Sequence, residues 1–141
     1  MNSVSYAFLE RFLTNPEDAI PILQLPKIVV DHLQVKTDIV LFSAASARKN
    51  LEHHPDLTLD DYYKLSQVGT TVDLVVQDGA TSVVLIRKEY VIYWVAVKAT
   101  KTKESLFLTS FRRSHEQDIQ RLLRKGKIIY QKEWTDGGAS Q

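Results

Sequence analysis

Cysteine is absent from the 141 residues, which excludes disulfides, thiolate metal sites and thiol catalysis. Long apolar runs are also absent, since no stretch approaches the roughly 18 residues of a membrane span. Residues 1–14 lack the basic start and apolar block of a secretory signal. We therefore expect a soluble, cytoplasmic protein without a membrane partner.

Several motifs of common enzyme classes are missing as well. The chain has no G-x-x-x-x-G-K-S/T segment, no glycine-rich loop after a strand and no nucleophile elbow. The His-His-Pro-Asp run at 53–56 crosses a helix end broken by proline, so its histidines lack the i, i+4 spacing of a helical zinc pair. We expect neither a cofactor nor a metal.

The chain does contain enough apolar residues for one globular domain. Hydrophobic residues make up 44% and charged residues 25%, a balance that argues against disorder. We place an amino-terminal helical extension at 1–37, an α+β domain at 38–135 and a flexible tail, rich in Gly and Ser, at 136–141.

Charge is divided unevenly along the chain although its net value is only +1. Residues 1–86 carry 6 Lys/Arg against 11 Asp/Glu, whereas residues 87–141 carry 12 against 6. The carboxyl-terminal part could therefore face nucleic acid or an acidic partner. Solvent-exposed helix faces are also rich in Lys and Arg. The charge asymmetry alone therefore does not distinguish a binding surface from an ordinary solvated one.

Helix signals are strongest in the first half of the chain. Ser43 can cap a helix from Ala44 to about His53, and Pro55 disfavours its continuation. A threonine cap at Thr58, with an acid three residues later, predicts another helix start. The other elements expected in this half are a helix over 4–13, a turn or two of helix within 17–25, short strands at 27–30 and 38–42, and a helix over 59–66.

Strand signals dominate the second half. Asp78-Gly79 predicts a hairpin between strands 72–77 and 82–88, and a polar loop at 101–104 joins two further strands. A capping box at Ser114 to Gln117 predicts a last helix, and 128–134 could add an edge strand. The expected fold is α+β, with amino-terminal helices packed on a four- to five-stranded antiparallel meander and a carboxyl-terminal capping helix.

The second hairpin carries polar groups on a strong strand pattern. If its loop closes symmetrically, Lys98 lies opposite Phe107 and diagonal to Thr109. Strand alternation then predicts two faces, one with Trp94, Ala96, Lys98, Phe107, Thr109 and Phe111, the other with Tyr93, Val95, Val97, Leu106, Leu108, Ser110 and Arg112. Helices should cover the second face, so the first is either the wall of a site or a half-exposed sheet surface.

These residues would suffice for RNA cleavage without a metal. That reaction needs a base for the 2′-hydroxyl, an acid for the leaving oxygen, and cations or hydroxyls around the phosphate. The candidate catalytic residues are His53, His54, Lys98, Thr109 and Ser110, and the candidate phosphate-binding residues are Arg112, Arg113, Arg121, Arg124 and Lys125.

Each candidate also has a simpler explanation. The two histidines could be solvated residues at a helix end, aimed in different directions so that only one reaches a given site. The arginines and Lys125 could form an ordinary wet surface. The residues alone leave both explanations open.

The segments LFSAASARKNLEHHPDLTLDDYYKL, DLVVQDG, YWVAVKAT and LFLTSFRRSHEQDIQRLLRKGK, taken in this order, resemble phage-associated nucleases of the barnase, EndoU, colicin and RelE-like superfamily. The resemblance covers roughly residues 38–127. It implies a small metal-independent endoribonuclease, a toxin or a phage or mobile-element effector, that leaves a 2′,3′-cyclic phosphate.

The resemblance also implies site residues and partners. The histidine that ends the helix corresponds to His53 or His54, the strand lysine to Lys98, and the penultimate strand's hydroxyls to Thr109 and Ser110. RNA, including tRNA, would be the substrate, and an inhibitor or immunity protein a partner. Relatives could carry a catalytic histidine at the position of Asn50, and this protein would then be weakened or inactive. The alternative function is a non-catalytic RNA- or protein-binding module.

Overall fold

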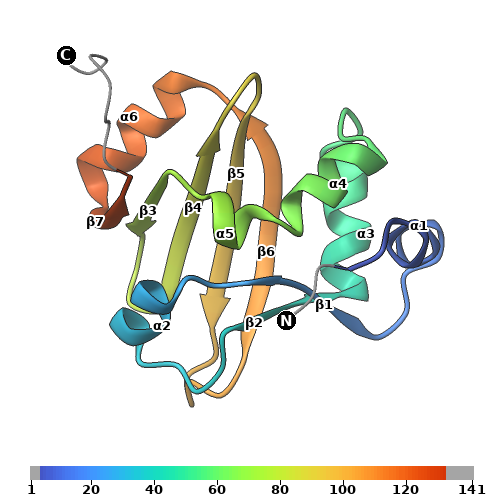
Figure 1. The fold of residues 1–141 in the computed structure, drawn as a ribbon, viewed down its shortest axis with the longest axis horizontal. Helices are drawn as coiled ribbons and strands as arrows, with labels where there is room; N and C mark the ends of the chain where they lie inside the picture. The colour runs from blue at the N-terminus through green and yellow to red at the C-terminus, as the bar shows by residue number, and fades with distance from the viewer. Residues whose placement is uncertain (1–3, 133–141) are drawn as a thin grey trace.

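A mixed β-sheet flanked by helices makes up the fold of the computed structural model, which describes residues 4–132 (Figure 1). In chain order the elements are α1 (Tyr6–Thr14), β1 (Ala19–Gln24), α2 (Lys27–Leu33), β2 (Ile39–Ser43), α3 (Ala44–His53), α4 (Leu59–Leu65), α5 (Val68–Thr71), β3 (Leu74–Gln77), β4 (Ser82–Lys88), β5 (Ile92–Ala99), β6 (Leu106–Ser114), α6 (Glu116–Lys125) and β7 (Lys127–Gln131). In this part of the chain, no helix is both long and apolar enough to cross a membrane.

The seven strands follow the order β1-β2-β6-β5-β4-β3-β7. All neighbours are antiparallel except β2 and β6, which run parallel. The predicted four- to five-stranded antiparallel meander with a terminal capping helix is therefore wrong, although the class is α+β. Strands β3 to β6 do follow one another, but β1 and β2 extend the sheet beyond β6, and β7 returns after α6 to extend it beyond β3.

Two elements of the amino-terminal part differ in type from those expected. The segment expected to form a turn or two of helix within 17–25 contains strand β1, and the strand expected at 27–30 is the start of helix α2. Pro21 lacks an amide hydrogen, but the edge position of β1 tolerates it, and Ile20 and Ile22 alternate inward. Pro26 is the residue before α2, and its carbonyl accepts hydrogen bonds from the Val29 and Val30 amides of the first turn.

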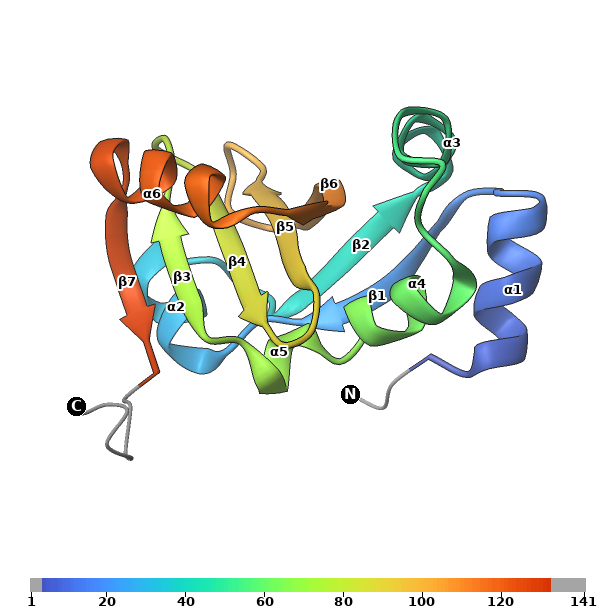
Figure 2. The same cartoon turned by 90° about the horizontal axis from the view of Figure 1, so that it is seen from above.

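Helices cover the two faces of the sheet unequally, as Figure 2 shows. The larger apolar cluster joins one face to α1, α2, α3, α4 and α5, and includes the buried rings of Phe42, Tyr62, Tyr93 and Phe111. On the other face, Ile119 and Leu122 of α6 pack in a smaller cluster on β3 and β4. The smaller cluster leaves part of its face uncovered near β5 and β6.

A β-bulge in β6 changes which side chains share a face. The predicted pairing of Lys98 with Phe107 is confirmed, but the register shifts beyond Val97, so that Ser110 pairs with Ala96. Phe111 is consequently fully buried with the larger cluster. The predicted faces of Phe111, Ser110 and Arg112 are therefore wrong, because one extra residue reverses the alternation after it.

The cap of the last helix is one residue later than predicted. His115 is the residue before α6, and Asp118 accepts hydrogen bonds from the His115 amide at 3.4 Å and the Ser114 hydroxyl at 2.9 Å. The predicted box from Ser114 to Gln117 is therefore wrong. Strand β7 confirms the start of the predicted edge strand, while Trp134 and the predicted tail lie outside the described residues.

Candidate functional site

Helix α3 lies beside β6 at the point where β2 diverges from it. The two strands pair only at Val40–Leu106 and Leu41–Phe107. Beyond these pairs, the Phe111 amide donates to Asn50 Oδ1 at 2.9 Å, and Asn50 Nδ2 donates to the Tyr62 hydroxyl at 2.9 Å. Asn50, only 5% exposed, therefore gives the strand edge a partner and fixes α3 against it.

A pocket of about 230 Å³ lies between α3 and β6. Its lining combines two imidazoles, an amine, an amide and two hydroxyls, from Lys49, Asn50, His53, His54, Thr109 and Ser110. Four of these six are predicted catalytic residues, brought together from opposite halves of the chain. Such a set can transfer protons and hold an anion.

The bulge explains why two consecutive hydroxyls face the same pocket. In a regular strand, neighbouring side chains point to opposite faces. Thr109 occupies the irregular position, and its hydroxyl donates to the Ala96 carbonyl at 3.2 Å. Both Thr109 and Ser110 therefore line the pocket, although the alternating pattern predicted opposite faces for them.

The two histidines lie at the carboxyl end of α3. His53 is the last helical residue and is exposed, whereas His54 is half-buried and its amide donates to the Asn50 carbonyl at 2.9 Å. Their ring centroids are 6.5 Å apart and the rings are nearly perpendicular. The expectation that only one of them would reach a given site is wrong, because both line the pocket.

Lys49 contributes the amine of the pocket. It precedes His53 by four residues, so the two side chains share one helix face. This spacing was visible in the sequence but carried no motif by which to choose Lys49. Lys98 is exposed on β5 opposite Phe107 and is not among the pocket residues.

The predicted phosphate-binding cations lie elsewhere, and most are already paired. Arg112 stacks on Trp94, with its guanidinium carbon 4.4 Å from the ring centroid, and contacts Asp118 at 3.3 Å. The other paired cations are Arg113 with Asp61 at 2.7 Å, Arg121 with Asp118 at 3.0 Å and Lys125 with Asp78 at 3.3 Å. Arg124 is exposed on α6 and makes no ion pair with another described residue.

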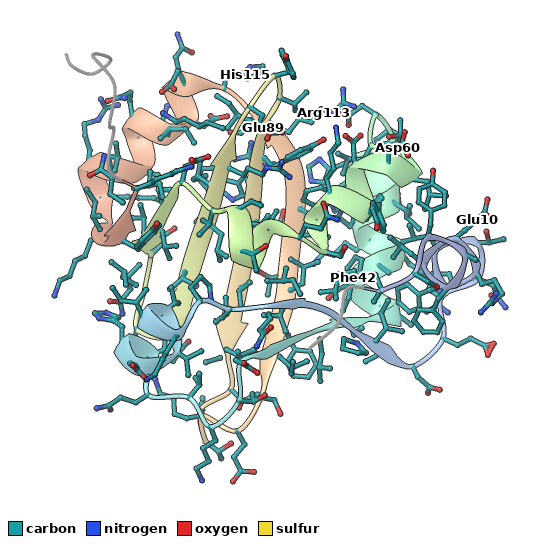
Figure 3. The ribbon with its side chains drawn as sticks, in the orientation of Figure 1. Glu10, Phe42, Asp60, Glu89, Arg113 and His115 are labelled. Carbon is teal, nitrogen blue, oxygen red and sulfur yellow. The ribbon has the colours of Figure 1, made fainter. Side chains whose placement is uncertain are left out.

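Asp61 organises a buried polar network that the sequence did not reveal. This carboxylate, 4% exposed, accepts from the Tyr93 hydroxyl at 2.5 Å, Arg113 at 2.7 Å and the Thr58 amide at 2.8 Å. Figure 3 shows Arg113 on the part of β6 that faces α4. The capping-box signal identified Asp61 as part of a helix start, but no local pattern connects it to Tyr93 or Arg113.

Two carboxyl groups have altered pKa values for identifiable reasons. Burial alone would raise the pKa of Asp61, but the hydrogen bonds from Thr58, Tyr93 and Arg113 together hold that pKa below its usual value. Burial and the hydrogen bond to Asp61 raise the pKa of Tyr93. The Ser114 hydroxyl, aided by Arg112, lowers the pKa of Asp118. Both carboxylates therefore stabilise the fold as anions.

We looked for side chains that could bind a metal ion together within residues 4–132. No group of three or more histidine, aspartate or glutamate side chains converges there. The pocket has two imidazoles but no carboxylate in its lining. Its chemistry is therefore that of neutral and cationic groups, which suits an anionic ligand.

Comparison with known proteins gives no further assignment. The resemblance to the barnase, EndoU, colicin and RelE-like nucleases stays a prediction. No family model, curated protein or solved structure matches this chain.

Proposed function

We propose that the protein is a metal-independent endoribonuclease whose active site is the pocket between α3 and β6. The observation that carries the proposal is the meeting of His53 and His54 with Thr109 and Ser110 in one pocket. Proton transfer by imidazoles is the central requirement of RNA cleavage without a metal. The resemblance to small nucleases supports the same reaction.

In the proposed reaction, one imidazole removes the proton of the 2′-hydroxyl, whose oxygen attacks the neighbouring phosphorus. The other imidazole gives a proton to the 5′-oxygen as its bond to phosphorus breaks, and the product is a 2′,3′-cyclic phosphate. The Lys49 amine and the two hydroxyls would hold the phosphate oxygens as negative charge develops on them. RNA is the substrate class because DNA lacks the attacking hydroxyl.

The test is incubation of purified protein with total RNA in excess chelator, followed by analysis of the new 3′ ends. We expect cyclic phosphate ends, and we expect His53→Ala and His54→Ala each to slow cleavage by about 100-fold or more. His32→Ala is a matched control, because His32 is exposed on α2 and contacts Gln77 instead.

Two results would contradict the proposal. One is RNA that stays intact while forming a salt-sensitive complex, which would indicate the non-catalytic binding module. The other is cleavage that both histidine variants perform at the wild-type rate, which would place any activity outside this pocket.

A further inference from the structure

A row of side chains crosses five strands on the face that α6 only partly covers. Successive cross-strand pairs join Pro21 to Leu41, Leu41 to Phe107, Phe107 to Lys98 and Lys98 to Ser82. None of the five is fully buried, whereas the residues that flank Phe107 and Lys98 along their strands are buried on the opposite face. The row is therefore a continuous, solvent-accessible strip.

The helices leave this strip uncovered. Leu41 and Phe107 belong to neither apolar cluster, while Trp94 and Ala96 on the same face pack under α6. Figure 2 shows α6 and α3 standing apart, with the β5–β6 ribbon between them. Phe107 is thus only partly buried, between the two helices (Figure 2).

The strip has the chemistry of a site for unpaired nucleotides. Within residues 4–132, Phe107 pairs with no other aromatic ring, and Trp94 is already stacked by Arg112. Beside Phe107, Lys98 is exposed and forms no ion pair with any described carboxylate. An open ring can stack a base, and an adjacent free amine can pair with a phosphate.

The strip also continues into the proposed active site. Thr109 lies two residues beyond Phe107 on β6, about 7 Å along the strand. An extended nucleotide can span such a distance. A chain seated on Phe107 could therefore place its next phosphate between Thr109, Ser110 and the histidines.

We propose that Phe107 and Lys98 bind a single-stranded RNA nucleotide next to the cut, with its base stacked on Phe107 and its phosphate paired with Lys98. The proposal rests on the proposed function for the position of the cut. Single-stranded RNA is favoured over a duplex because a base must be unpaired to stack on a side chain. It is favoured over a protein partner because a lysine and a serine share the narrow strip with only two large apolar side chains.

Binding can be measured separately from cleavage with a short 2′-O-methyl oligouridine, which lacks the attacking hydroxyl. We expect Phe107→Leu, which keeps an apolar side chain but loses the ring, to weaken binding about tenfold. Phe107→Tyr keeps the ring and should bind like the wild type. Thermal unfolding of each variant verifies that it is folded.

An abasic oligonucleotide of the same length provides the matched ligand control. The wild type should bind it about tenfold more weakly than the oligouridine, and Phe107→Leu should cause no further loss. Lys98→Met should weaken both ligands and lower the dependence of affinity on salt.

The outcomes distinguish this inference from the proposed nuclease activity. Binding that depends on Phe107 in a protein that never cleaves RNA would support the strip and contradict the nuclease. Cleavage of RNA together with equal affinity of wild type and Phe107→Leu would overturn the strip and leave the nuclease. Failure of the wild type to bind the oligouridine, or equal affinity for the abasic ligand, would also overturn it.

Discussion

At the scale of single residues, the lysines at the candidate site differ from most of the predicted phosphate-binding cations in having no carboxylate partner within residues 4–132. Lys49 in the pocket and Lys98 on the strip have no carboxylate partner among the described residues, whereas Arg112, Arg113, Arg121 and Lys125 do. A cation already paired with a carboxylate must give up that partner to bind phosphate. Side-chain identity alone could not rank these cations.

Lys49 and Lys98 should contribute differently to cleavage, because only Lys49 lines the pocket. We expect Lys49→Met to lower kcat by about 100-fold, because its amine would stabilise charge that develops only in the transition state. Lys98→Met should mainly raise KM, because Lys98 lies outside the pocket. Steady-state kinetics on a fluorescent RNA substrate measures both constants. A larger loss of kcat for Lys98→Met would restore that lysine to the catalytic role that the sequence predicted.

Asp61 gives a residue-scale prediction about stability. Asp61→Asn should lower the free energy of unfolding at pH 7 by about 1 to 3 kcal/mol, because the ion pair with Arg113 is lost. Since the pKa of Asp61 is lowered by folding, the carboxylate stabilises the protein above its unfolded pKa of about 3.9 and loses that contribution as the pH falls below it. The difference between variant and wild type should therefore shrink toward pH 2.

Urea unfolding followed by circular dichroism at pH 7 and pH 3 measures this difference. Asp56→Asn is the control, since Asp56 is exposed and makes no ion pair with another described residue. An Asp61→Asn penalty that stays constant over this pH range would show that the carboxylate's charge does not contribute to stability.

At the scale of elements, the site depends on the junction of α3 with the irregular part of β6. Local signals correctly predicted α3, from the Ser43 cap to His53 before Pro55. They could not predict that the helix would lie along β6, because Asn50 and Phe111 are 61 residues apart. The Asn50 side chain joins α3 to β6 through its hydrogen bonds. This structural role explains an asparagine at position 50 without a catalytic role.

The bulge can be tested by removing its extra residue. Deleting Thr109 should restore regular pairing, with Leu108 opposite Val97 and Ser110 opposite Ala96 as they are now. We expect the melting temperature to fall by only a few degrees while RNA cleavage falls at least tenfold, because the pocket loses one of its two hydroxyls.

Deleting Leu108 instead is the control for this experiment. Thr109 would then occupy a buried apolar position, so the melting temperature should fall much further than with the Thr109 deletion. If the Thr109 deletion variant cleaves RNA at the wild-type rate, the bulge has no role in the site.

At the scale of the whole molecule, one core connects both ends of the described chain. Ile20, Ile22 and Leu23 of β1 belong to the same apolar cluster as Phe111 of β6. Helix α5 approaches β1 so closely that a Cβ on Gly69 would lie 1.7 Å from the Gln24 carbonyl oxygen. The part before residue 38 thus contributes to the core that supports the site.

A fragment that begins at Asp38 should therefore fail to fold alone. It would lose the buried side chains of β1 and α2 and expose the edge of β2 to solvent. Circular dichroism and proton NMR of the fragment and the full chain make the comparison. Sharp, dispersed signals from the fragment would instead support the domain boundary predicted at residue 37.

The sequence by itself determined the features that arise between residues a few positions apart. The caps at Ser43 and Thr58, the helix end before Pro55 and the hairpin at Asp78-Gly79 follow from short-range hydrogen bonds and backbone restrictions. These effects act whatever the rest of the chain does. They were therefore predictable without a structure.

Only the tertiary structure decided that β2 lies beside β6, where the register of β6 shifts and which cations pair with a carboxylate. Each of these depends on residues far apart in sequence, such as Arg113 and Asp61, for which many pairings satisfy the same local pattern. The shared core selects one of them, because a change of register by a single residue would turn apolar side chains such as Phe111 into solvent.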